Sequence, residues 1–201
     1  MINELSVLRI GCISASRISD MLSGGKGITR ERYAAQLAAE RMTGRPHRAN
    51  VSTAATRHGH EFEPMARMKY ELKHMVMVSG TGSEWVPHPF IQNAGCSPDG
   101  MVDEDGLTEF KNPETHTFFR YLATGEIPKD YKAQMLWQLA CTRRKWCDWV
   151  AHDPDMPDEY GYIEVRFEPA ASEIADLERE VRFFNAEIED LILLIKEKRK
   201  P

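Results

Sequence analysis

Residues 95–111 read Gly-Cys-Ser-Pro-Asp-Gly-Met-Val-Asp-Glu-Asp-Gly-Leu-Thr-Glu-Phe-Lys, and this segment carries the clearest structural signal of the chain. Its middle, the acidic run from Asp103 to Gly106, has the composition of a tight turn. We therefore predict a β-hairpin over residues 94–112. The flanking run from Gly95 to Gly100 predicts a second tight turn, which brings one charged residue into an otherwise apolar region.

Three charged side chains of the predicted hairpin converge on one place. Successive side chains of a strand alternate between faces, so Glu109 and Lys111 point the same way, and Asp99 on the partner strand reaches the same spot. Converging carboxylates repel unless a cation lies between them, and oxygen ligands suit Mg²⁺ or Mn²⁺. The ammonium of Lys111 beside that ion can hold an attacking water and offset charge on a phosphate. This set indicates phosphodiester hydrolysis; the alternative is an exposed strand face with cross-strand ion pairs.

The rest of the chain predicts an α/β (α+β) fold, in which a mixed sheet is flanked by helices. We expect helices over residues 29–43, 53–75 with a break at Gly59, 115–124 and 129–145, and strands over residues 146–152 and 160–167. A long amphipathic C-terminal helix over about residues 172–199 is predicted from an apolar stripe. The stripe consists of Ile174, Leu177, Val181, Phe184, Ile188, Leu191 and Ile195.

Composition bounds the class of protein. The 201 residues are 42% hydrophobic and 28% charged, which is typical of one soluble domain, residues 1–201, with a core at about residues 8–167. No run of 18 apolar residues or signal peptide pattern is present, so we expect no membrane association. The four cysteines form no CxxC pair, which disfavours zinc and iron–sulfur sites.

Charge is distributed unevenly along the chain. The net charge is −5, yet residues 153–190 hold 13 acidic and 3 basic side chains. Residues 26–48 and the run Arg143-Arg144-Lys145 are basic. Local positive surface of this kind fits nucleic acid, although solvated helix faces are an alternative.

Four motifs in order give the chain a family resemblance. Gly95 to Asp99, followed by Glu109-Phe110-Lys111, resembles the PD-(D/E)xK nuclease core, and more narrowly that of the lambda exonuclease and YqaJ-like viral recombinase family. The run Arg9-Ile10-Gly11-Cys12-Ile13-Ser14-Ala15-Ser16 resembles the family's N-terminal motif. Gly59-His60-Glu61-Phe62-Glu63 and Tyr131-Lys132-Ala133-Gln134 resemble its two helical motifs. The resemblance covers about residues 8–167 and implies a restriction-endonuclease-like core with a mixed central sheet.

The resemblance implies catalytic roles. Asp99 and Glu109 would be metal ligands, Lys111 would position the water, and Glu63 would assist at a second metal or through a metal-bound water. Gln134 would orient the nucleophile or the scissile phosphate. Glu61 is an alternative to Glu63. Gln138 lies one turn from Gln134 on the same predicted helix, so we expect one of the two to be catalytic and the other structural. The nearby His58 and His60 are interpreted as surface or supporting residues, because carboxylates already supply hard ligands.

The resemblance also implies that Arg9, Ser16 and Ser97 form a pocket for the 5′-phosphate of a DNA end. An arginine offers a bidentate fork to phosphate oxygens, and hydroxyls add neutral hydrogen bonds. The alternative for Ser14 and Ser16 is that they cap the helix that follows.

The resemblance implies a Mg²⁺-dependent enzyme, with Mn²⁺ able to substitute. It would digest one strand of linear double-stranded DNA from the 5′ end and leave a 3′ overhang for recombination. It further implies a ring-shaped homotrimer, a single-strand annealing protein as partner, and a phage or prophage origin in the cytoplasm of a bacterial host. A repair or restriction-like endonuclease and an inactive DNA-end-binding module are the alternatives.

Overall fold

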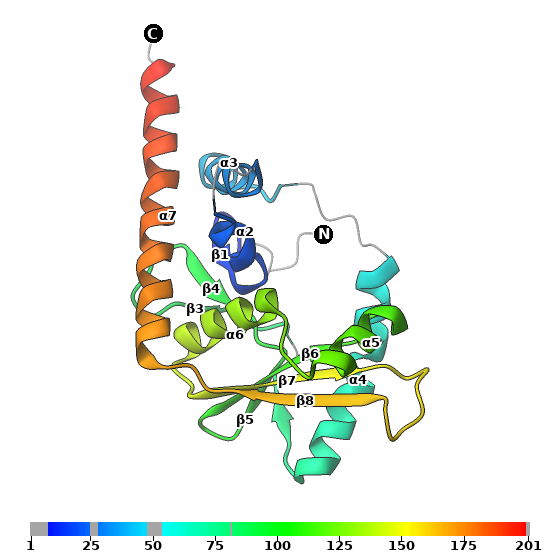
Figure 1. Cartoon of the computed structure of the whole chain (residues 1–201). Helices are drawn as coiled ribbons and strands as arrows, with labels where there is room; N and C mark the ends of the chain where they lie inside the picture. Colours follow the sequence, from blue (N-terminus) through cyan, green and yellow to red (C-terminus); the bar gives the residue numbers. More distant parts are fainter. Residues whose placement is uncertain (1–7, 25–27, 48–53, 81, 200–201) are drawn as a thin grey trace.

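The computed structural model describes residues 8–24, 28–47, 54–80 and 82–199, with the backbone alone for 54–60. Its described part contains two sheets (Figure 1). A small sheet has the order β1 (Ile13–Ser14), β4 (Ala94–Cys96), β3 (Val86–Pro87). A larger sheet has the order β2 (Val78–Ser79), β5 (Gly100–Val102), β6 (Gly106–Lys111), β7 (Trp146–His152), β8 (Tyr162–Phe167). Strands β6 and β7 are parallel and the other neighbours of this sheet are antiparallel, so the sheet is mixed.

The predicted hairpin is shorter than expected. It comprises β5 and β6 with the turn between them, where Asp103 adopts a left-handed φ of 46°. Residues 94–96 instead form β4, which pairs with β1 and β3 in the other sheet. Pro98 has no N–H to donate to a ladder, which separates β4 from β5. Asp99 therefore lies directly before β5 rather than within a partner strand.

Glycine is required at the start of β5. A Cβ atom at Gly100 would collide with the side chains of Val78 and Thr108, on the strands that flank β5. The close approach of β2 and β6 at this point fixes the backbone immediately after Asp99.

Helices cover both faces of the larger sheet. On one face α5 (Thr115–Thr124) and α6 (Lys129–Thr142) pack against Leu107, Trp149 and Ala151. On the other face α4 (Ala54–His74) packs Ala66 and Tyr70 against Phe110 and Val150. Alternate residues of β6 and β7 thus face opposite helices, which explains why these strands are almost wholly buried.

The long C-terminal helix α7 (Ala171–Lys198) lies along one side of the molecule, and its end projects beyond the other elements (Figure 1). It packs against α3 (Ile28–Thr43) and α6. The predicted stripe is buried from Leu177 to Ile188. Towards the end of the helix the buried residue is Ile192 rather than the predicted Leu191, and Ile195 is 38% exposed. The projecting end has no element beside it in the described part of the chain, so the stripe is not covered there.

The remaining elements are short or close to prediction. The 3₁₀ helix η1 (Ala15–Arg17) and α2 (Ile18–Leu22) follow β1. Helix α6 ends three residues before the predicted Lys145, because Arg143 adopts a left-handed φ of 60° and its N–H bonds to Leu139. Helix α4 runs through Gly59 without the predicted break.

The predicted mixed α/β fold with a long C-terminal helix is confirmed. Its organisation as a single domain over residues 1–201 stays a prediction. None of the described helices is long and apolar enough to cross a membrane.

Candidate active site

Glu109 is the centre of the predicted site. It is completely buried on β6, and Lys111, two residues later on the same face, donates from Nζ to its Oε1 atom. Helix α6 supplies two more donors. Gln134 Nε2 lies 2.5 Å from Oε1, and Gln138 Nε2 lies 2.6 Å from Oε2. One glutamine was predicted to be catalytic and the other structural; both contact the carboxylate, because one helical turn separates them.

Asp99 is fixed beside these residues by the backbone of β6. Its Oδ2 atom accepts a hydrogen bond of 2.9 Å from the N–H of Phe110, the residue between Glu109 and Lys111. Arg67 of α4 donates to the main-chain oxygen of Asp99 and, at 3.1 Å, to that of Val78. The carboxylate is therefore held next to the Glu109 and Lys111 side chains, as the sequence predicted.

Glu63 approaches the same place from α4. It is partly buried, and its negative charge raises the pKa of Asp99. Glu61, its predicted alternative, is exposed. The geometry thus associates Glu63, rather than Glu61, with Asp99. The side chains of His58 and His60 lie outside the described residues.

The carboxylates and the lysine perturb one another electrostatically. Burial and the charges of Glu109 and Glu63 together raise the pKa of Asp99 to about 8, although Lys111 and the N–H of Phe110 oppose the change. Burial alone would lower the pKa of Lys111, but Glu109 and Asp99 hold it above its ordinary value. Lys111 is therefore a stable ammonium, while the charges of Glu109 and Glu63 oppose ionisation of Asp99, which a bound cation would favour.

The predicted phosphate-binding residues lie on the N-terminal side of this cluster. Arg9 Nη2 donates to Ser97 Oγ at 2.6 Å and to the Gly82 main-chain oxygen at 3.2 Å. Arg9 and Ser16 line one cleft of about 570 Å³. Ser97, the partner of Arg9, precedes Asp99 by two residues. The segment 97–99 therefore connects the cleft-lining Arg9 with the carboxylates.

The capping alternative for the serines is wrong. Ser14 stands at the N-cap position of η1 but makes no side-chain capping bond, and Ser16 lies inside η1. The two hydroxyl oxygens are instead 3.4 Å apart, and both border the cleft.

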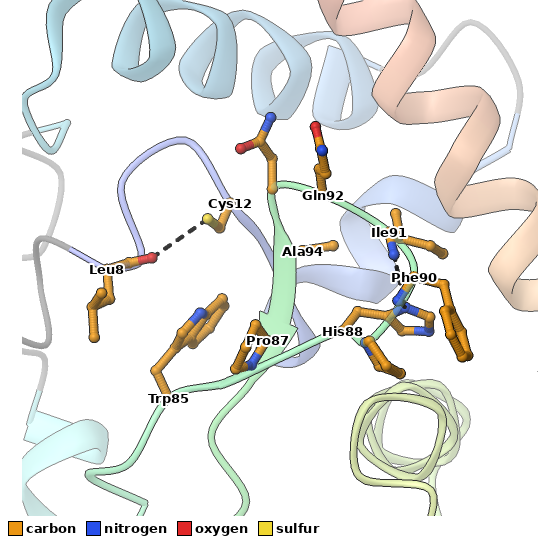
Figure 2. Close-up of a pocket in the computed structure, with 11 residues that line it drawn as sticks. Leu8, Cys12, Trp85, Pro87, His88, Phe90, Ile91, Gln92 and Ala94 are labelled. Carbon is orange, nitrogen blue, oxygen red and sulfur yellow. Dashed lines mark hydrogen bonds between the residues drawn. The ribbon is translucent and has the colours of Figure 1, made fainter.

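A second cavity, of about 680 Å³, lies beside the loop between β3 and β4 (Figure 2). Its lining is mainly apolar and includes Trp85, Pro87 and Ile91. Trp85 also carries the Arg9 guanidinium over its ring, 5.6 Å from the centroid. None of the lining residues is a carboxylate, and the titratable side chains that line the cavity are Cys12 and His88.

Comparison with known proteins agrees with this geometry. Residues 6–145 match the model of the YqaJ-like viral recombinase domain. The chain belongs to the YqaJ-like viral recombinase family. None of the curated proteins gives a significant match.

Solved structures of exonucleases are similar over nearly the whole chain. The alkaline exonuclease LHK-Exo from Laribacter hongkongensis is 37% identical, with a TM-score of 0.89 and coverage of 97% of this chain and 96% of that one. The structure of LHK-Exo in complex with dAMP is 38% identical, with a TM-score of 0.88 and coverage of 96% of this chain and 95% of that one. A phage-related exonuclease from Haemophilus somnus 129PT is 15% identical with a TM-score of 0.72, covers 93% and 96%, and shares the fold. The prediction of a metal-dependent DNA nuclease is thus confirmed at the level of the family.

The residues present fit a hard divalent cation. Within the described residues, no group of three or more His, Cys, Asp or Glu side chains is arranged to hold a metal ion. The charges of Asp99, Glu109 and Glu63 nevertheless act on one another, and carboxylate oxygens are the ligands that Mg²⁺ and Mn²⁺ prefer. Lys111 partly offsets this charge, and a divalent cation would offset the remainder.

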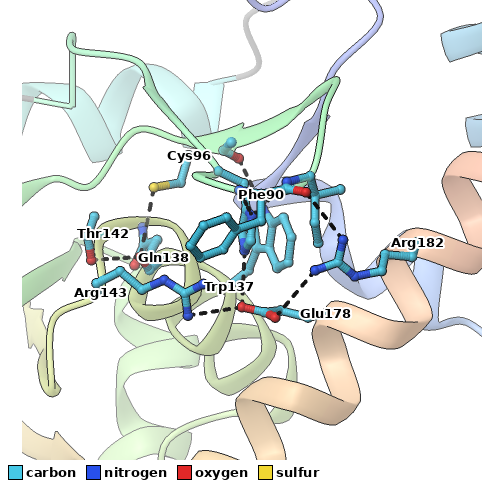
Figure 3. A network of polar contacts seen from close by, with 11 residues as sticks. Phe90, Cys96, Trp137, Gln138, Thr142, Arg143, Glu178 and Arg182 are labelled. Carbon is cyan, nitrogen blue, oxygen red and sulfur yellow. Dashed lines mark hydrogen bonds and ion pairs between the residues drawn. The ribbon is translucent and has the colours of Figure 1, made fainter.

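Helix α6, which carries both glutamines, is fixed from its other side (Figure 3). Trp137 Nε1 donates to the Gly95 main-chain oxygen at 3.1 Å, and Cys96 Sγ lies 4.0 Å from the main-chain oxygen of Gln138. His88 stacks on Trp137 with ring centroids 5.0 Å apart, and its Nε2 lies 3.2 Å from Glu178 of α7. Strand β4 and helix α7 thus determine where α6 presents its glutamines.

Two residues near the site were not given a role by the sequence. Arg67 stands one turn after Glu63 on α4, and this i, i+4 spacing could have revealed it. Tyr131 begins the recognised helical motif, and its ring lies under Lys111, with Nζ 5.1 Å from the centroid. A motif match shows which residues recur, whereas these contacts show what they touch.

Proposed function

We propose that this protein is a Mg²⁺-dependent exonuclease that digests the 5′-ended strand of linear double-stranded DNA and leaves a 3′ overhang. The observation that carries the proposal is the hydrogen bond between Arg9 and Ser97, two residues before Asp99. A 5′-phosphate bound at Arg9 would bring the first internucleotide bond to the carboxylates. Cleavage at that bond releases one nucleotide at a time.

The chain's own residues would share the work of hydrolysis. Mg²⁺ held by Asp99, Glu109 and Glu63 would act as a Lewis acid on the scissile phosphate, with Mn²⁺ able to replace it. Lys111, held as an ammonium by its neighbours, would position the attacking water and offset charge on the phosphate. Gln134 and Gln138 keep the Glu109 carboxylate in a fixed orientation, and the sequence resemblance adds a contact of Gln134 to the nucleophile or phosphate.

The similarity to LHK-Exo supports this proposal. That exonuclease forms a complex with dAMP, and a deoxynucleoside monophosphate is the product expected of stepwise digestion. The cleft of about 570 Å³ beside Arg9 has the size typical of a nucleotide-sized ligand.

Linear duplex DNA with a 5′-phosphate and a label on each strand in turn tests the proposal. In Mg²⁺, we expect loss of the 5′-ended strand only, no product from a covalently closed circle, and no product from Lys111→Ala. Lys132→Ala, which changes an exposed lysine on α6, is the matched control and keeps activity. Cutting of the circle would identify an endonuclease, and digestion from the 3′ end would reverse the proposed polarity.

We also propose a ring-shaped homotrimer that acts with a single-strand annealing protein in the cytoplasm of a phage-carrying host. Exposed apolar side chains support assembly: Met68 and Leu72 on α4, Met75 directly after it, and Leu193 and Leu194 on the projecting end of α7. Light scattering at micromolar protein would contradict the trimer if it gave only monomer.

A further inference from the structure

We propose that Arg17 is a second phosphate-binding residue of the cleft that contains Arg9, and that it binds the 5′-ended strand of the DNA substrate. This inference rests on the proposed function, because it assumes that a DNA end enters this cleft. It adds a cation that belongs neither to the carboxylate cluster nor to the predicted Arg9–Ser16–Ser97 pocket.

Arg17 lies at the wall of the cleft together with the serine hydroxyls. Arg9, Ser14, Ser16 and Arg17 all line it, and Arg17 follows Ser16 directly in η1. The side chain is 39% exposed, so part of it is accessible to a ligand. Two arginines therefore border one cleft of nucleotide size, with two hydroxyls beside them.

The Arg17 guanidinium is held in a defined plane. It stacks over the ring of Tyr33, 4.4 Å from the centroid, and its Nη1 lies 3.4 Å from Gln36 Oε1. Tyr33 is itself buried, and its hydroxyl accepts the N–H of Ser14 at 3.2 Å. An arginine fixed in this way loses little conformational freedom when it binds an anion, which favours a bidentate contact to phosphate.

The one carboxylate that lines the cleft is occupied by other partners. Glu40 is 8% exposed and accepts the N–H groups of Gly11 at 2.8 Å and His47 at 3.0 Å. Its Oε1 also accepts from Gln36 Nε2 at 3.1 Å. The carboxylate thus shapes the loop that carries Arg9, and forms no ion pair with either arginine among the described residues.

The ion pair that Arg17 makes does not account for its position. Its Nε atom bonds to Asp20, three residues later, and the two side chains are 39% and 34% exposed. An exposed i, i+3 pair contributes little to stability, and a doubly bonded phosphate competes well with it. Arg17 lines the cleft and Asp20 does not. The ion pair therefore engages the Nε edge of the guanidinium and brings no carboxylate into the cleft.

Binding of a fluorescent duplex, measured in EDTA to prevent hydrolysis, tests the proposal. We expect Arg17→Gln to weaken binding by about tenfold and to lower the salt dependence by about one phosphate contact. Arg32→Gln, which removes an exposed arginine on α3 that does not line the cleft, is the matched control and leaves the affinity unchanged. Thermal melting should agree within about 2 °C for the three proteins, since the lost ion pair is exposed.

Asp20→Asn separates phosphate binding from a structural role. If Arg17 binds phosphate, removal of the competing carboxylate strengthens DNA binding. If Arg17 serves only to pair with Asp20, this variant weakens binding as Arg17→Gln does, and the proposal is overturned. Unchanged affinity in Arg17→Gln would overturn it equally.

Duplexes with a 5′-phosphate or a 5′-hydroxyl identify the phosphate. A loss confined to the 5′-phosphorylated duplex assigns Arg17 to the terminal phosphate, and an equal loss on both assigns it to the next phosphate of that strand. The digestion assay keeps this inference separate from the proposed function. A wild-type protein that digests the 5′-ended strand, with an Arg17→Gln variant that binds and digests normally, would refute the inference alone.

Discussion

Gln138 donates a hydrogen bond of 2.6 Å to Oε2 of Glu109, and both side chains are completely inaccessible to solvent. A carboxylate is thus stabilised inside the protein by a neutral amide from a helix, in addition to the ammonium of Lys111. The arrangement leaves the Glu109 carboxyl group oriented before any ligand arrives.

Gln138→Leu should destabilise the protein more than Gln134→Leu. Removal of a buried donor leaves one carboxylate oxygen unsatisfied, which costs about 1–3 kcal/mol, whereas Gln134 is only partly buried and water can replace it. Urea unfolding of the two variants in EDTA measures the difference. Equal destabilisation would mean that burial of Gln138 does not matter to the carboxylate.

Lys111→Met should abolish nuclease activity without preventing DNA binding. The ammonium is lost from the catalytic cluster, while the Arg9 cleft is unchanged, so we expect a fall in kcat of at least about 10²-fold. Single-turnover digestion and binding in EDTA give the two quantities. Lys132→Met, which changes an exposed lysine of α6, is the control. A loss of binding equal to the loss of activity would contradict a purely catalytic role.

The stability of the metal-free protein should fall as pH rises from about 4 to about 8. Asp99 has a pKa of about 8 in the folded protein against an ordinary value of 3.8, so in this window the folded state holds a proton that the unfolded chain has released. The free energy of unfolding therefore decreases with pH and levels off above pH 8.

Asp99→Asn should remove most of this dependence. We expect the wild type to lose about 3–4 kcal/mol between pH 5 and pH 8 in EDTA, and the variant to lose little, because an amide does not titrate. Urea unfolding at both pH values is the measurement. A variant with the same slope as the wild type would show that other groups cause it.

Arg166→Met should destabilise the larger sheet. Arg166 bonds to the buried Asp148 through Nε at 2.8 Å and Nη2 at 2.9 Å, and Tyr70 donates to the same carboxylate at 2.7 Å. Loss of the arginine leaves a buried carboxylate without its cation, which costs about 3–5 kcal/mol; since Arg166 is half-exposed, the lower end applies.

A double-mutant cycle with Asp148→Leu tests that assignment. The double variant should be more stable than Arg166→Met alone, because no unpaired charge remains. Nuclease activity of both folded variants should match the wild type, since the pair is on the α4 face and Glu109 is on the α6 face. Additive losses would show that the two residues do not interact.

Local sequence patterns predicted an element well where a single local signal, such as apolar alternation or a glycine at a helix end, determines it. Alternation in Ile163, Val165 and Phe167 gave β8, and the left-handed Gly125 ended α5 where the glycine suggested it. The sequence could not reveal that residues 94–96 pair with β1, because parallel pairing across 81 positions leaves no local trace.

The candidate site divides in the same way. Asp99, Glu109 and Lys111 were visible because they stand close together on a predicted hairpin and resemble a known motif. The simultaneous contact of Gln134 and Gln138 with Glu109 was not, since it depends on how deeply α6 packs. Arg17 escaped notice because its position depends on Tyr33, which lies on another helix.

The two halves of the site also differ in how the chain must be connected to build them. The partners of Glu109 are 2, 25 and 29 residues away, whereas Arg9 and Ser97 are 88 residues apart. Closure of the longer loop costs more chain entropy and is repaid only after β4 is in place. We therefore expect the carboxylate half, a nearly contiguous module, to assemble early and the N-terminal segment to complete the cleft last. If the cleft selects the DNA end as proposed, substrate selection would be the property that folding acquires at the end and that local unfolding would remove first.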